Sequence, residues 1–278
     1  MEIKNVFIVA SEQTLEVSCA VAEAAAYSGY NIKFKCENEK DLRRAEQLIK
    51  DLSNKRSGNE GVSERFQATT DLAEAGNADI AIESVFEDET LKKNTLAELD
   101  TICPAHTILA TNTSTITVTE LARATGRPEN VIGMHFIYFS PVIKVVEVVR
   151  GWETAQAAFD TCAGFAASLE METVNPEDTP GLISTRLWMV HLNEAANNVY
   201  NKLVEPASLV KLNRTISPNA MSILESADFI GLDNCVAFLR NLYHAYGDPK
   251  YVPSPQLMQM VSSGQLGMRS GKGFFNYS

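Results

Sequence analysis

The first half of the chain alternates short apolar runs with segments of helical periodicity, and this alternation limits the fold more than any other feature. Residues 5–10 (NVFIVA) have the composition of a buried strand, and residues 15–29 have helical spacing and end in Gly29. Further strand-like runs occupy 30–36, 78–85, 107–114, 130–138 and 143–150, with helical segments at 38–56 and 88–103. The pattern predicts a Rossmann-like, doubly wound α/β domain, with helices on both faces of a mainly parallel sheet.

The second half of the chain has a different pattern. Residues 179–203 form a long segment of helical periodicity with Pro180 near its start, and residues 206–216, 226–247 and 254–266 continue with helical spacing. No strand-like run occurs among them. We therefore expect a Rossmann-like, dinucleotide-binding type of domain over residues 1–178 and an all-α domain over residues 179–278.

Composition and charge exclude several classes of function. The formal net charge is −11 at pH 7, which argues against nucleic acid and anionic membrane surfaces as partners. The five cysteines are scattered, with no spacing typical of a disulfide framework or a zinc site, so no metal site is expected. No signal peptide and no apolar run long enough to cross a bilayer is apparent. These features predict a cytoplasmic protein.

A histidine and a glutamate stand out in the last two strand-like runs. His135 comes at the end of a predicted strand, where parallel sheets usually present their ligand-binding residues. Glu147 follows twelve positions later inside the apolar run VIKVVEVV. A carboxylate in apolar surroundings needs a partner, and an imidazole is a suitable one, because the carboxylate would fix its tautomer for proton transfer. The alternative is an alternating strand in which Glu147 faces water.

Five longer segments of the sequence carry information beyond the pair His135 and Glu147. They are ATNTSTITVTELARATGRPENVIGMHF, PVIKVVEVVRG, DTPGLISTRL, ADFIGLD and SGKGFFNY. Together, and in this order, they resemble the 3-hydroxyacyl-CoA dehydrogenase family over nearly the whole chain. The resemblance implies a cytoplasmic NAD-dependent oxidoreductase of fatty acid metabolism. It also implies a helical domain that forms a homodimer and a substrate that is an acyl-CoA or acyl-carrier-protein thioester.

The resemblance also assigns roles to individual residues. It implies that His135 is the general base, oriented by Glu147, and that Ser114 binds the substrate oxygen. Thr185 takes the place of an active-site asparagine of the family. The positions that the resemblance places on the nicotinamide side or in the cofactor site are Glu87, Lys92 and Asn112.

The predicted cofactor turn departs from the family pattern. The family has G-x-G-x-x-G between the first strand and its helix, whereas this chain has no glycine before Gly29. In one register the three glycine positions fall on Ala10, Glu12 and Leu15; in the other they fall on Gln13, Leu15 and Ser18. We expect Leu15 to fill the space of the pyrophosphate, and Glu12 or Glu16 to repel it by on the order of 4 kcal/mol at ~4 Å. The turn therefore predicts weak or absent NAD binding.

Other family positions also differ. The acid that would hold the adenosine ribose is Cys36, with Glu37 one position out of register. Tyr138 and Phe139 replace an asparagine and a proline, and residues 219–223 replace a turn of the helical domain. Lys50, Lys55 and Arg56 could contact CoA phosphates, but solvated surface charge explains them better.

Three functional hypotheses remain open from the sequence. The first is a 3-hydroxyacyl thioester dehydrogenase that binds NAD through an unusual turn. The second is an enzyme that keeps His135 and Glu147 for cofactor-free acyl-thioester chemistry, as a hydrolase or lyase. The third is a non-catalytic subunit whose helical half associates with an active relative.

Overall fold

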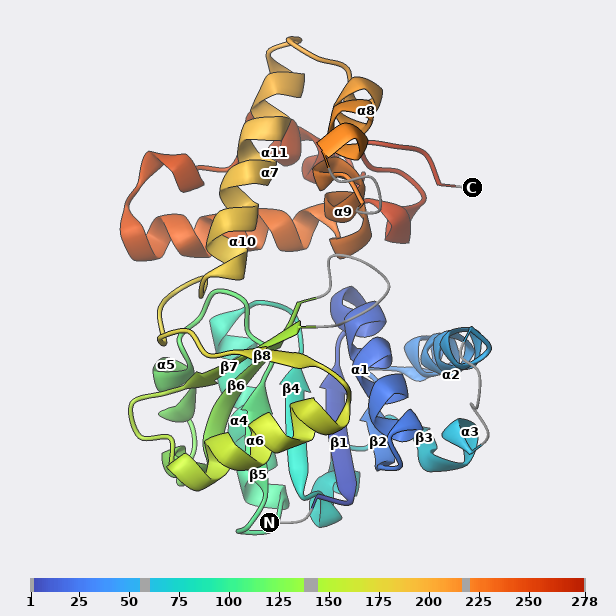
Figure 1. The fold of residues 1–278 in the computed structure, drawn as a ribbon, viewed down its shortest axis with the longest axis vertical. Helices are drawn as coiled ribbons and strands as arrows, with labels where there is room; N and C mark the ends of the chain where they lie inside the picture. The colour runs from blue at the N-terminus through green and yellow to red at the C-terminus, as the bar shows by residue number, and fades with distance from the viewer. Residues whose placement is uncertain (1–2, 56–60, 138–144, 217–220, 278) are drawn as a thin grey trace. The chain divides into compact units, whose positions relative to one another are not determined.

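The computed structural model describes residues 3–55, 61–137, 145–216 and 221–277. The chain divides into two compact units, one that runs to Thr179 and one that begins at Pro180. Both units are drawn in Figure 1.

The first unit is built on a sheet of eight strands in the order β3-β2-β1-β4-β5-β6-β7-β8. The neighbours pair in parallel except β6 and β7, which are antiparallel. The predicted Rossmann-like, mainly parallel sheet is therefore confirmed. The strands are β1 (Asn5–Ala10), β2 (Asn31–Lys35), β3 (Phe66–Thr69), β4 (Ile80–Ser84), β5 (Ile108–Thr111), β6 (Val131–Phe136), β7 (Val145–Arg150) and β8 (Glu172–Val174).

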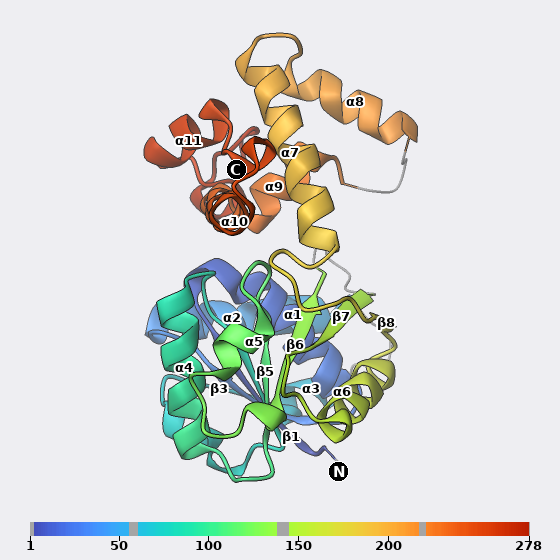
Figure 2. The ribbon, with the colours of Figure 1, turned by 90° about the vertical axis from the view of Figure 1, so that its left-hand side faces the viewer.

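Helices cover both faces of this sheet (Figure 1, Figure 2). The alanine-rich α1 (Leu15–Tyr27) packs together with α2 (Glu39–Ser53) and α6 (Gln156–Ser168) in one apolar core. The opposite face is covered by α4 (Glu89–Ile102) and α5 (Val118–Ala122), and a short α3 (Val62–Arg65) precedes β3. Because both faces are covered, the central strands β1 and β4 are buried almost throughout and do not alternate between buried and exposed residues.

The second unit is helical in the part of it that the structure describes. Its helices are α7 (Ser184–Tyr200), α8 (Pro206–Ile216), α9 (Ile223–Ile230), α10 (Leu232–Tyr246) and α11 (Pro255–Ser262). Two starts follow directly from sequence. Ser222 and Glu225 form a capping box at α9, and Ser254 caps α11 ahead of Pro255. The predicted all-α second half is confirmed.

A buried carboxylate fastens the C-terminal tail to α9. Asp228 has no exposed surface and accepts hydrogen bonds from the backbone nitrogens of Phe274 (2.9 Å) and Phe275 (3.0 Å), and from the hydroxyl of Tyr277 (2.9 Å). A Cβ atom at Gly273 would lie 1.9 Å from its Oδ1, so only glycine allows this approach. The contact joins the sequence segments ADFIGLD and SGKGFFNY.

We expect Asp228→Asn to lower the free energy of unfolding by about 1–3 kcal/mol, because the amide NH2 would face N–H donors in a buried site. Tyr277→Phe removes one of the three donors and is expected to cost roughly half as much. Urea unfolding of both variants measures the difference. Equal stability of Asp228→Asn and the unaltered protein would contradict this role.

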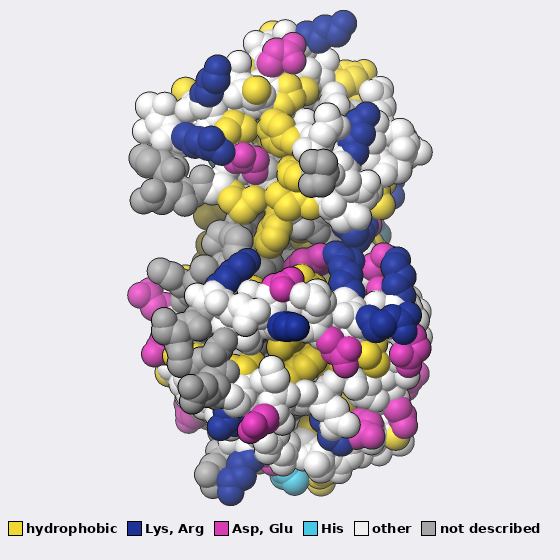
Figure 3. Space-filling model, turned by 90° about the vertical axis from the view of Figure 1, so that its right-hand side faces the viewer, with side chains coloured by type: hydrophobic (Ala, Val, Ile, Leu, Met, Phe, Trp, Pro, Cys, Tyr) yellow, Lys and Arg dark blue, Asp and Glu magenta, His cyan; other side chains and the backbone are white. Residues whose placement is uncertain are grey.

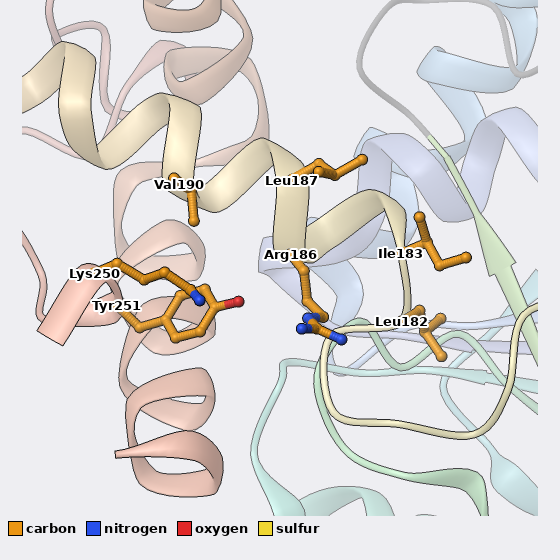
Figure 4. Close-up of a pocket in the computed structure, with 7 residues that line it drawn as sticks. All are labelled: Leu182, Ile183, Arg186, Leu187, Val190, Lys250 and Tyr251. Atoms are coloured by element: carbon orange, nitrogen blue, oxygen red, sulfur yellow. The ribbon is translucent and has the colours of Figure 1, made fainter. Parts of the chain in front are cut away.

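The helical unit also holds a pocket of about 390 Å3, drawn in Figure 4. Its walls are mainly apolar and come from the start of α7 and from Tyr251. Two cations contribute to its lining: Arg186, whose guanidinium lies 4.9 Å from the centre of the Tyr246 ring, and Lys250, which pairs with Asp248 at 2.7 Å. The sequence interpretation assigned no function to these residues.

Candidate active site

The polar residues of interest share one face of the sheet. Glu83, Thr111 and Glu147 alternate with Ile82, Ala110 and the valines of β7 that belong to the core under α1 and α6. Successive side chains on a strand point to opposite faces, so the polar set lies on the other face. Strand pairing also aligns the set: Glu83 is the register partner of Thr111, and His135 is the register partner of Glu147.

His135 and Glu147 form a buried hydrogen-bonded pair. The antiparallel register places them directly opposite each other, and His135 Nδ1 lies 2.7 Å from Glu147 Oε2. The two residues are 7% and 2% exposed. The alternative in which Glu147 faces water is therefore wrong. The carboxylate favours the tautomer with the proton on Nδ1, which leaves Nε2 able to accept a proton.

Ser114 lies at the other ring nitrogen. It follows β5 in the turn that the sequence NTST forms, and its Oγ is 3.1 Å from His135 Nε2. The three side chains thus form a hydrogen-bonded chain from Ser114 through His135 to Glu147. This is the geometry in which a general base and a hydroxyl group can share one substrate oxygen.

The carboxylate of Glu87 stabilises the turn that carries Ser114. Its Oε1 accepts hydrogen bonds from the Ser114 nitrogen at 2.8 Å and the Thr113 hydroxyl at 2.7 Å. It also accepts from the nitrogen and the hydroxyl of Thr115, at 2.5 and 2.8 Å. Burial by itself would raise the pKa of Glu87, but Lys92 and these hydrogen bonds outweigh it and hold the pKa below its usual value.

Lys92 lies between two carboxylates. From α4 its Nζ reaches Glu83 Oε1 at 2.9 Å, Glu87 Oε2 at 3.4 Å and the carbonyl of Val85 at 3.1 Å. Burial by itself would lower the pKa of Lys92, yet the two carboxylates raise it, so the ammonium stays charged. The sequence interpretation missed Glu83. The available signal was a carboxylate within the buried run ADIAIESV, the same signal that identified Glu147.

Asn112 connects the ends of three strands. Its Oδ1 accepts from the Phe136 nitrogen of β6 at 2.9 Å, and its Nδ2 donates to Ser84 Oγ at 3.0 Å. Ser84 Oγ also accepts a hydrogen bond from Ser18 Oγ at 3.0 Å, and the Ser84 carbonyl accepts one from the Thr14 hydroxyl. The start of α1 is thereby tied to the carboxyl end of β4 through side chains.

The turn after β1 differs from what its sequence predicts. Leu15 is fully buried in the apolar core with α1, so the expectation that it fills the space of the pyrophosphate is wrong. The two glutamates are also balanced by cations of α2: Glu12 pairs with Lys40 at 3.5 Å, and Glu16 pairs with Arg44. The repulsion expected of unpaired glutamates is reduced accordingly.

The ribose-side residues are placed as their register predicts. Cys36 is fully buried in the core, and burial raises the pKa of its thiol to about 12, so it carries no charge at neutral pH. Glu37 is exposed. Lys50 and Lys55 are exposed as well, which agrees with solvated surface charge. The remaining predictions for Arg56, Tyr138, Phe139 and residues 219–220 lie outside the described residues.

Thr185 lies in the helical unit. It occupies the first turn of α7 and is 3% exposed.

Within the described ranges, no group of three or more His, Cys, Asp or Glu side chains is arranged to hold a metal ion. No helix in that part of the chain is long and apolar enough to cross a membrane. All five cysteines are free and buried.

The fold and the site together define a class of protein. The sheet order reverses between β1 and β4, which is the position where doubly wound folds bind dinucleotides. A buried acid–base pair stands on the same sheet, and a helical unit follows. This combination is that of a two-unit oxidoreductase of the dinucleotide-binding type. Residues 17–179 match the family described as "3-hydroxyacyl-CoA dehydrogenase, NAD binding domain", and residues 181–277 match "3-hydroxyacyl-CoA dehydrogenase, C-terminal domain".

Similar proteins agree over the whole length. The chain is 37% identical over 285 residues to a probable 3-hydroxybutyryl-CoA dehydrogenase of Bacillus subtilis, covering 100% of this chain and 98% of the relative. It is 35% identical to the corresponding protein of Deinococcus radiodurans, covering 92% and 95%. The crystal structure of M. tuberculosis FadB2 aligns with a TM-score of 0.88 and 28% identity, covering both chains fully. That of (S)-3-hydroxybutyryl-CoA dehydrogenase from Ralstonia eutropha aligns with a TM-score of 0.82 and 27% identity, also in full. The chain belongs to the 3-hydroxyacyl-CoA dehydrogenase family.

Proposed function

We propose that this protein is an oxidoreductase that interconverts a 3-hydroxyacyl thioester and its 3-oxoacyl form with NAD as the hydride carrier. The observation that carries the proposal is the buried line Ser114–His135–Glu147, in which one ring nitrogen is committed to the carboxylate and the other faces a hydroxyl. The names of the similar proteins, 3-hydroxybutyryl-CoA dehydrogenases among them, support an acyl-CoA substrate.

The proposed chemistry assigns each residue one task. His135 Nε2 takes the proton of the substrate 3-hydroxyl, and Glu147 stabilises the imidazolium that results. Ser114 Oγ donates to the same oxygen as it becomes a ketone. A bound NAD would supply the acceptor for the hydride that leaves C3. In the reverse direction the protonated His135 returns its proton to the ketone oxygen.

The structure of the turn is compatible with a bound dinucleotide. Leu15 packs into the core, and Glu12 and Glu16 each have a cationic partner on α2. We propose that Asn112, Glu87 and Lys92 shape the nicotinamide end of the cofactor site. The last two act through the Ser114 turn, because both are almost fully buried.

We assign residues 1–178 to the cofactor domain and residues 179–278 to a helical domain that contributes Thr185 to the substrate side. Exposed apolar side chains of the helical unit, among them Leu187 at 70% and Leu203 at 73%, support a homodimer through this domain. Figure 3 shows hydrophobic side chains gathered on one face of this unit. Sedimentation velocity should then give twice the chain mass of 30.5 kDa. The buried free thiols support a cytoplasmic location.

Calorimetric titration with NADH and NADPH, followed by turnover of acetoacetyl-CoA, tests the proposal. We expect micromolar binding of NADH and consumption of NADH by the thioester. No heat up to millimolar cofactor, together with no NADH consumption at any acyl chain length, would contradict it. That result would favour the second candidate, cofactor-free thioester chemistry at His135 and Glu147, which the absence of glycine from the turn motivates.

The pairing of Glu16 with Arg44 gives a prediction for cofactor affinity. We expect Arg44→Gln to weaken NADH binding about fivefold, on the order of 1 kcal/mol, because it leaves Glu16 uncompensated beside the cofactor phosphates. The double variant Glu16→Gln/Arg44→Gln should recover most of the affinity. Arg43→Gln, on the same helix but exposed, is the matched control and should change the dissociation constant less than twofold. Equal effects of Arg43→Gln and Arg44→Gln would refute the prediction.

A further inference from the structure

Glu83 is a buried carboxylate with a defined partner for each oxygen. It has no exposed surface at the carboxyl end of β4. Its Oε1 accepts from the Val85 nitrogen at 2.7 Å and from Lys92 Nζ at 2.9 Å, and its Oε2 accepts from the Thr111 hydroxyl at 2.7 Å. Two of these partners, Lys92 and Thr111, connect Glu83 to the turn that carries Ser114.

The first connection from Glu83 to Ser114 runs through Lys92. The ammonium is shared between Glu83 and Glu87, and all three side chains are at most 4% exposed. Glu87 in turn accepts from the backbone nitrogens of Ser114 and Thr115. One cation between two carboxylates has a position set by both, so a change in the charge of Glu83 shifts Lys92 relative to Glu87.

The second connection runs through Thr111. The hydroxyl that donates to Glu83 Oε2 also accepts from the Thr113 nitrogen at 3.2 Å. An acceptor on one side of this hydroxyl fixes its orientation, so its lone pairs face the Thr113 nitrogen. Both connections therefore end on the same three residues, 113–115, whose middle member presents its hydroxyl to His135.

We propose that Glu83 is a positioning residue that sets the place of the Ser114 hydroxyl, acting through Lys92 and Glu87 on one side and through Thr111 on the other. The inference rests on the proposed function in so far as Ser114 binds the substrate oxygen. The geometric part, that Glu83 controls the contact between Ser114 and His135, can be measured without turnover.

A double-mutant cycle tests the catalytic part. Glu83→Gln keeps the shape of the side chain and removes its charge, and we expect it to lower kcat for acetoacetyl-CoA about tenfold with KM within twofold. In a Ser114→Ala background the same substitution should change kcat less than twofold, because the group through which it acts is gone. Independent effects, with a further tenfold loss in the Ser114→Ala background, would overturn the proposal.

Nitrogen NMR of the histidine rings tests the geometric part. The chain has four histidines, and a His135→Gln sample identifies the signals of His135. We expect Glu83→Gln to move the Nε2 signal of His135 in the same direction as Ser114→Ala does, while the other three rings stay unchanged. An unchanged Nε2 signal in Glu83→Gln would overturn the proposal. A moved signal in a protein that never consumes NADH would leave the positioning role standing and refute only the proposed function.

Two further variants separate positioning from general loss of stability. Asp228→Asn weakens a buried carboxylate contact in the helical unit, so it should lower the melting temperature without moving the His135 signal. If Glu83→Gln fails to fold, Thr111→Val breaks the second connection alone and Thr111→Ser restores it. We expect the His135 signal to move in Thr111→Val and to return in Thr111→Ser, and no movement in Thr111→Val would overturn the proposal.

Discussion

His135→Gln is expected to lower kcat for the reduction of acetoacetyl-CoA by a factor of about 10³, within the range of 10² to 10⁴ that a positioned acid–base group contributes. The glutamine amide fills similar space but neither gives nor takes a proton. His106→Gln is the matched control, because His106 is exposed and pairs only with Asp79 at 3.4 Å in the described structure. Its kcat should stay within twofold. Retention of more than a tenth of kcat in His135→Gln would contradict the role of the dyad.

Glu147→Gln extends the same prediction to the second member of the pair. An amide in place of the carboxylate presents either an N–H or a neutral oxygen to His135 Nδ1, so it no longer selects one tautomer and no longer stabilises the imidazolium. We expect a loss of about 10²-fold in kcat. Glu153→Gln is the control. Glu153 is an exposed carboxylate of the same unit, whereas Glu147 is 2% exposed and lies opposite His135.

The pairing of His135 with Glu147 could be predicted because burial restricts what a carboxylate can do. An apolar run on both sides of Glu147 predicts a buried strand, and a buried carboxylate needs a donor. The strand that ends in His135 supplies one twelve residues earlier. What the sequence did not specify is the antiparallel register that makes the two residues direct neighbours, since the segment between them has no diagnostic turn.

Glu83 and the cofactor turn mark the limit of that reasoning. The same buried-carboxylate argument applies to Glu83, but its partner Lys92 lies on the following helix, and a lysine on a charged helix is usually solvated. Glu12 and Glu16 are compensated by Lys40 and Arg44, which are 28 residues away along the chain. Sequence spacing predicts which residues share one helix face; it does not predict which side chains meet between two helices.

Short edge strands were the other omission. β3 (FQAT) and β8 (ETV) are only partly buried or exposed, so they lack the apolar runs that identify the central strands. Their pairing depends on the neighbouring strand rather than on their own composition: β3 adds to β2, and β8 adds to β7. The other six strands, β1, β2, β4, β5, β6 and β7, are those that the sequence predicted.

Lys92→Met is expected to give the largest loss of stability, about 3–5 kcal/mol, because it leaves Glu83 and Glu87 buried without their shared cation. Lys93→Met is the matched control. It removes the adjacent lysine of the same helix, which is 31% exposed and pairs with Glu89 and Glu120, and it should cost less than about 1 kcal/mol. Urea unfolding at pH 7 measures both variants. Equal losses in the two would contradict the importance of the buried cluster.

The pH dependence of the Lys92→Met variant should have the opposite sign to that of the unaltered protein. In the unaltered protein the pKa of Glu87 is below its usual value, so its contribution is present above that usual value and is lost as the pH falls through the lowered one. Without Lys92, burial and the neighbouring Glu83 raise the pKa of Glu87 instead. The folded variant then binds a proton more tightly than its unfolded chain, and its stability rises as the pH falls from 7 to 5. Unfolding curves at pH 5, 6 and 7 distinguish the two slopes, and parallel slopes would show that Lys92 does not set the charge of Glu87.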